Sequence, residues 1–144
     1  MSRGERRAAL GVVRRPADAA LLLRVTCVAA FVPAAMRLPL PRSAAILRPR
    51  RRRPPRSPEY VERVVAAVDA ARIAAYPVVR QGCLTRAVTL FWFLARAGVP
   101  VELRFGIART GEADGHAWLA LDGAAYLETT DPEPKFTVTY RISP

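Results

Sequence analysis

The chain has 144 residues, enough for one domain that buries about 70% of the surface exposed in its unfolded form. Its formal charge is +11, but residues 1–56 carry +12, from fourteen arginines and two acidic residues, whereas residues 57–144 carry −1. A biased base composition also produces such an arginine run, so the charge does not by itself indicate a nucleic-acid partner. An acidic peptide, a protein partner or a lipid surface remain alternative partners for this segment.

The number and spacing of the cysteines argue against a disulfide-rich protein and against a zinc protein. Cys27 and Cys83 are the only cysteines, and no Cys-x-x-Cys spacing occurs. Neither a disulfide framework nor a zinc site is therefore expected, and a reducing cytoplasm suits the chain best. We expect no cofactor.

The most apolar run of the chain follows residues 1–16, which are polar and basic and are expected to be poorly ordered. It predicts a helix over residues 19–36, with Asp18 as the N-cap. The run imitates a secretory signal, but Arg24 lies inside it and Pro33 interrupts it, which also makes it a poor transmembrane segment. We expect a core helix or a partner-docking helix in a cytoplasmic protein, with peripheral membrane contact as the alternative.

Residues 37–57 are predicted to form a non-helical linker, because five prolines interrupt them and the arginines at 50–53 repel one another. Ser57-Pro58-Glu59 then has the composition of a helix start. Apolar residues at helical spacing mark the predicted buried face of this helix: Val61, Val64, Val65, Val68 and Ala71. Pro77 should end it. We therefore expect a basic segment over residues 1–56 and a core over residues 57–144.

The next predicted helix begins at Cys83, and Gly98 has the position of its C-terminal glycine. Its apolar stripe is formed by Leu84, Ala87, Val88, Phe91 and Leu94. The apolar period then changes to two, which predicts strands over 101–107, 116–121, 124–128 and 136–142. The first is expected to be half-buried, with Val101, Leu103, Phe105 and Ile107 on the buried face and Glu102, Arg104 and Gly106 on the other. Polar residues 110–115 form the turn after the first strand, and Asp122-Gly123 is a strong hairpin signal after the second. Helices followed by antiparallel strands indicate an α+β fold.

Cys83 is the candidate nucleophile. Unpaired N–H groups and the positive dipole end at a helix start favour a thiolate over a thiol. The alternative is a buried apolar cysteine, but Gln81, Gly82 and Thr85 around Cys83 are polar or small. Cys27, inside the apolar helix, is assigned to packing.

His116, the only histidine, is the candidate general base. An imidazole can take the thiol proton and later protonate a departing amine. The alternative is a packed core ring. Trp118 lies on the same face of the strand, where it would form an apolar wall beside the ring, and it is also a candidate for contact with the substrate.

Three acidic residues are candidates for orienting the imidazole. Asp122 is about 20 Å from His116 along the strand, which is too far. Glu128 would face His116 if the hairpin has a three-residue turn, but a strict two-residue turn would place Thr129 there instead. We favour Glu128 and keep Asp122 and Asp131 in reserve.

Gln81 precedes the candidate nucleophile by two residues. Its side-chain amide could donate a hydrogen bond to a tetrahedral oxyanion, together with the backbone N–H of Cys83. The alternative is an ordinary loop glutamine.

Three segments together, Gln81-Gly-Cys-Leu-Thr-Arg-Ala87, Leu94–Gly106 and His116-Ala-Trp-Leu-Ala-Leu-Asp-Gly123, resemble the lasso-peptide leader peptidases of the transglutaminase-like superfamily. The resemblance covers roughly residues 77–128. It implies a papain-like cysteine protease, with Cys83 as nucleophile, His116 as base and Glu128 in the place of the family's acid, which is commonly Asp.

The resemblance also implies partners. A leader peptidase removes the leader from a ribosomally made precursor peptide before an ATP-using cyclase closes the macrolactam. Residues 1–56 are too short and too rich in Pro and Arg to be a leader-recognition domain, so a separate recognition protein is implied. Two other functions stay open: acyl transfer by the same residues, and a non-catalytic basic scaffold that binds RNA or anionic membrane. The basic third lacks the interleaved aromatic residues that single-stranded RNA binding would need.

Overall fold

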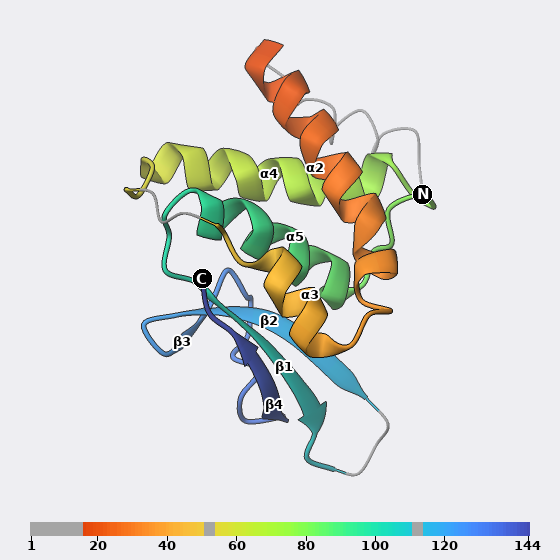
Figure 1. Ribbon diagram of the computed structural model, residues 1–144, viewed down its shortest axis with the longest axis vertical. Helices are drawn as coiled ribbons and strands as arrows, with labels where there is room; N and C mark the ends of the chain where they lie inside the picture. The colour runs from red at the N-terminus through yellow and green to blue at the C-terminus, as the bar shows by residue number, and fades with distance from the viewer. Residues whose placement is uncertain (1–15, 51–53, 111–113) are drawn as a thin grey trace.

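The computed structural model describes residues 16–50, 54–110 and 114–144. Within them, a layer of helices packs on one antiparallel sheet, so the predicted α+β fold is confirmed (Figure 1). In chain order the elements are α2 (Pro16–Ala35), α3 (Leu40–Leu47), α4 (Pro58–Ala74), α5 (Cys83–Arg96), β1 (Glu102–Ala108), β2 (Gly115–Leu121), β3 (Ala124–Tyr126) and β4 (Phe136–Ile142). The predictions for residues 1–15, and for parts of the arginine run and of the turn after β1, fall outside the described residues.

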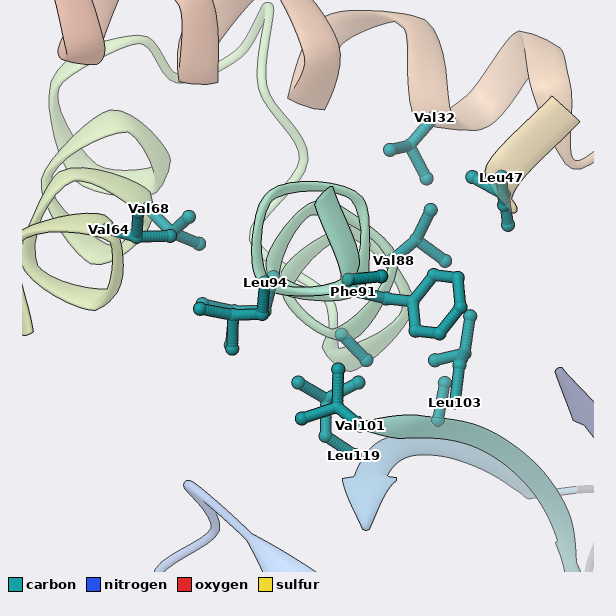
Figure 2. Close-up of a cluster of buried hydrophobic side chains, with 14 of the residues drawn as sticks. Val32, Leu47, Val64, Val68, Val88, Phe91, Leu94, Val101, Leu103 and Leu119 are labelled. Carbon is teal, nitrogen blue, oxygen red and sulfur yellow. The ribbon is translucent and has the colours of Figure 1, made fainter. Parts of the chain in front are cut away.

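Helix α5 is the centre of the molecule. The structure packs it between α4 on one side, α2 and α3 on another, and the sheet below (Figure 2). The predicted apolar stripe is buried apart from Leu84, which is half-buried, and Leu90 and Ala95 outside that stripe are buried as well. Gly98 follows the helix with φ 81°, as predicted for a C-terminal glycine.

Helix α4 begins at Pro58, as predicted, with Ser57 at the N-cap, and it ends at Ala74, before Pro77. Its buried residues are Val64, Ala67, Val68, Ala70 and Ala71, whereas the predicted Val61 and Val65 are only half-buried. The buried face is therefore rotated slightly towards the alanines, which let α2 and α5 approach closely.

Helix α2 begins at Pro16, so Asp18 lies in its first turn and not at the N-cap. Asp18 forms an ion pair of 2.6 Å with Arg63 of α4. The inner side of α2, at Val25, Ala29 and Val32, is buried, in agreement with a helix that packs on the core. The assignment of Cys27 to packing is wrong, because Cys27 lies on another side of the helix and is exposed.

The prediction of a non-helical linker over residues 37–57 is wrong, because α3 lies within it. Pro39 is the N-cap and Pro41 lies in the first turn, where a helix needs no N–H donor. The hydroxyl of Ser43, which is fully buried, donates to the carbonyl oxygen of Ala35 at 2.9 Å and thereby ties α3 to the end of α2.

The strand order is β3-β2-β1-β4. In β1 the predicted alternation holds at Leu103, but Ile107 is exposed and Arg104 is buried. Ile107 lies near the end of β1 that extends away from the helices (Figure 1). Arg104 is buried because the second face of the sheet is covered too, by a cluster that includes Trp118 and Phe136.

Arg104 is compensated by two carboxylates. Its Nε lies 2.6 Å from Glu102, and Nη1 pairs with Glu133. Burial alone lowers the pKa of Arg104, but the two carboxylates outweigh burial and raise it above its ordinary value. The second face of the sheet therefore accommodates a buried cation.

Candidate active site

Cys83 is the first residue of α5, as the sequence predicted, and it is half-buried. The N-cap is Gly82, which has no side chain to accept from the free N–H groups of the first turn. The sulfur therefore lies beside the positive end of the helix, where negative charge is stabilised. Because the rest of α5 is packed in the core, this position is fixed.

His116 is the second residue of β2, and its ring packs against two aromatic rings that also contact each other. The centroid distances are 5.8 Å to Trp118 and 5.1 Å to Phe136, with interplanar angles of 19° and 23°. The predicted apolar wall is therefore present, with Phe136 as a member that the sequence did not indicate. Trp118 is fully buried, so the prediction that it contacts the substrate is not supported. Trp118 instead packs against the imidazole ring.

Gly106 makes room for this stack. It pairs with His116 across β1 and β2, and a Cβ at this position would lie 2.9 Å from the ring of Trp118. Glycine at this position is therefore required by the close approach of the indole, and the position of Trp118 in turn determines where the imidazole lies.

Glu128 is the acidic residue that reaches His116. Its Oε2 lies 3.6 Å from His116 Nε2, and both side chains are largely buried. The reserve candidates lie elsewhere: Asp122 is in the exposed hairpin turn, and the exposed Asp131 accepts a hydrogen bond from the backbone N–H of Glu133.

The reason we gave for the contact between Glu128 and His116 is nevertheless wrong. Leu121 pairs with Ala124, so the hairpin has a strict two-residue turn and not the three-residue turn that we favoured. Strand β3 ends at Tyr126, and Leu127 then adopts a left-handed conformation with φ 60°. The chain leaves the sheet at this point, and the changed direction brings the Glu128 carboxylate to the imidazole.

Arg86 is a site residue that we did not single out from the sequence. Its Nη1 donates to the carbonyl oxygen of Leu127 at 2.9 Å and lies 3.5 Å from Glu128 Oε1, while Nε donates to Asp69 of α4 at 3.0 Å. Arg86 is thus shared between α4, α5 and the segment after β3. A charged side chain one turn after Cys83, on the same side of the helix, was the available signal.

These contacts connect the nucleophile helix with the histidine. Cys83 and Arg86 are three residues apart and so are neighbours on the surface of α5. Arg86 contacts Glu128, and Glu128 contacts His116. Among the described residues, no hydrogen bond joins the Cys83 sulfur to His116. The imidazole packs with Trp118 on the second face of the sheet, whereas Ala117 and Leu119 of β2 face the helices.

The Gln81 side chain is hydrogen-bonded to α4. Its side-chain amide donates to the carbonyl oxygen of Arg72 on α4 at 3.3 Å, and its own carbonyl oxygen accepts from the Arg72 guanidinium. This contact supports the alternative of a structural loop glutamine. The backbone N–H of Cys83 remains as the candidate oxyanion donor.

Comparison with known proteins identifies the superfamily of the chain. The family model described as transglutaminase-like superfamily matches residues 25–141, from within α2 almost to the end of β4. No curated protein and no solved structure gives a significant match. The superfamily's fold generally serves cysteine proteases and acyltransferases. With the match covering most of its length, the chain belongs to the transglutaminase-like superfamily.

Proposed function

We propose that this protein is a cysteine peptidase that removes the leader from a ribosomally made lasso precursor peptide. The observation that carries the proposal is the chain of contacts from the helix of Cys83 through Arg86 and Glu128 to His116. Superfamily membership supports thiol chemistry, and the three sequence segments that resemble leader peptidases support this substrate.

In this proposal the two imidazole nitrogens have different tasks. Glu128 faces Nε2, which favours a proton on that nitrogen and leaves the Nδ1 lone pair to accept the thiol proton. The Cys83 thiolate then attacks the carbonyl carbon at the junction of leader and core. The backbone N–H of Cys83 donates to the oxyanion that forms.

His116 completes the reaction. The imidazolium gives its proton to the departing amine of the core peptide, and the C–N bond breaks. Water, deprotonated by the imidazole, attacks the thioester and releases the leader as a carboxylate, with the thiol restored. The Cys83 sulfur and His116 Nδ1 must approach to hydrogen-bonding distance for this, and such contacts often tighten only when substrate is bound.

The partners in this proposal are the precursor peptide, a separate leader-recognition protein and a lasso cyclase that acts on the product. The test is a reconstituted mixture of the chain with a precursor peptide and its recognition protein, followed by mass spectrometry. We expect Cys83→Ala to abolish leader cleavage, because in this proposal the Cys83 thiol forms the acyl-enzyme. Cys27→Ala, which removes the exposed thiol of α2, is the matched control and should cleave normally.

Retained cleavage by Cys83→Ala would end the proposal. Acyl transfer is the second candidate, because the superfamily fold serves both reactions. Adding a free amine separates the two: a peptidase gives the leader acid, whereas an acyltransferase gives the leader amide.

A further inference from the structure

The outer surface of α2 and α3 exposes an unusual number of apolar side chains. Of the eight large apolar residues that are exposed in the described residues, five lie here: Leu23, Phe31, Leu38, Leu40 and Ile46. We refer to these five residues, together with the arginines between positions 24 and 50, as the α2–α3 face. Figure 1 shows both helices at the outside of the helical layer. A concentration of this kind marks an interaction surface.

Helix α2 lies along the surface of the protein. By length and composition alone it could cross a membrane. However, Val25, Ala29 and Val32 on its inner side are buried, while Leu23 and Phe31 on the other side are 66% and 72% exposed. A helix with one side in the protein core and apolar side chains on the other is suited to lie in a membrane interface.

The charges of this face are basic and uncompensated. Residues 16–50 contain five arginines and a single acidic residue, Asp18, which pairs with Arg63. Within the described residues, no hydrogen bond or ion pair engages four of these guanidinium groups, those of Arg24, Arg37, Arg42 and Arg50. Their charge is therefore available to an anionic partner.

Two adjoining recesses on the face differ in character. One has a volume of about 480 Å³ and is lined by apolar residues that include Phe31 and Leu47. The other, of about 620 Å³, is lined by Arg48 and Arg50. Ile46 and Trp92 line both recesses, so the two recesses adjoin. An apolar recess beside a cationic one fits an acyl chain attached to a phosphate headgroup.

We propose that the α2–α3 face binds the surface of an anionic lipid bilayer. Phe31 and its apolar neighbours enter the boundary of the acyl chains, and the arginines extend to the headgroup phosphates. An acidic protein would satisfy the same charge, but it would not need the pairing of an apolar recess with a cationic one. The proposal is independent of the peptidase proposal, because no residue of the candidate active site takes part.

The experiment is co-sedimentation of the full chain, as Cys83→Ser, with vesicles of phosphatidylglycerol and phosphatidylcholine or of phosphatidylcholine alone. Each arginine near an anionic surface strengthens binding about fivefold, so we expect at least about a tenfold preference for the anionic vesicles, lost at high salt. A polarity-sensitive fluorophore on Cys27, which lines the apolar recess, should shift to the blue on binding.

Matched variants locate the surface. Phe31→Asp, and Arg42→Glu combined with Arg50→Glu, should each reduce binding at least about fivefold. The controls make the same changes elsewhere: Ile107→Asp on β1, and Arg109→Glu combined with Arg141→Glu, both exposed. Circular dichroism verifies that each variant is folded. These controls should bind as the parent does.

Three results would overturn the proposal. The chain could stay in the supernatant with anionic vesicles, it could bind neutral vesicles equally well, or the controls could lose as much binding as the face variants. The first result would assign the face to an acidic protein partner. None of these readouts requires catalysis, so failure here leaves the peptidase proposal untouched.

Discussion

Replacing Arg86 with methionine tests whether this residue joins the nucleophile helix to the Glu128–His116 pair. Methionine keeps most of the side-chain volume but removes the contacts with Leu127, Glu128 and Asp69. The lost hydrogen bond from a charged donor to the Leu127 carbonyl costs about 1.5–3 kcal/mol. The two ion pairs add about 1 kcal/mol in total, because Asp69 is 42% exposed and keeps Arg72 as a partner.

The expected loss in unfolding free energy is therefore about 2.5–4 kcal/mol, or about 8–13 °C in Tm for a domain of this size. Denaturant unfolding of Arg86→Met against the wild type measures it. Lys135→Met is the control, because it removes one ion pair whose two side chains are 60% and 50% exposed, and it should cost less than about 1 kcal/mol.

A purely structural role for Arg86 would change stability alone, so a second measurement is needed. In a Cys27→Ala background Cys83 is the only thiol, and its rate of alkylation by iodoacetamide reports the environment of the sulfur. If Arg86 positions Glu128, the rate should fall about tenfold or more in Arg86→Met. Stability within about 0.5 kcal/mol of the wild type, or an unchanged alkylation rate, would refute the positioning role.

Two further changes test the site. Gly106→Ala forces the Trp118 ring to move, because the added Cβ would lie 2.9 Å from it. We expect denaturant unfolding to show a loss of about 1–3 kcal/mol in unfolding free energy, and we expect slower alkylation of Cys83. Unchanged values of both would contradict the stacking argument. Glu128→Gln keeps the side-chain shape but removes the charge that holds the His116 tautomer. The rate of leader cleavage should therefore fall at least about tenfold. Cleavage at the wild-type rate would show that another group orients the imidazole.

Local sequence signals predicted the elements that carry the candidate nucleophile and base. Proline after serine at residue 57 set the start of α4, and the glycine at residue 98 set the end of α5, because each residue suits one backbone position. The Asp122-Gly123 pair has positive φ at both residues, as the predicted hairpin turn requires. Such signals depend only on neighbours in the chain.

The errors occur where tertiary contacts override those signals. Prolines in residues 37–57 suggested a linker, yet two of them start α3, whose buried Ser43 and Leu47 pack against the rest of the fold. Arg104 was assigned to solvent by alternation, but the second face of the sheet is covered as well. Which prolines begin a helix, and which strand faces are covered, depends on segments far away in the sequence.

The sequence by itself determined that Cys83 stands at a helix start and His116 at a strand start, because hydrophobic periodicity and turn residues are local properties. Only the tertiary structure decided which carboxylate meets the imidazole. Glu128 reaches His116 because Leu127 adopts a left-handed conformation and Arg86 holds the following carbonyl and carboxylate against α5. Leucine carries no signal for that conformation, so packing against a distant helix fixed the arrangement.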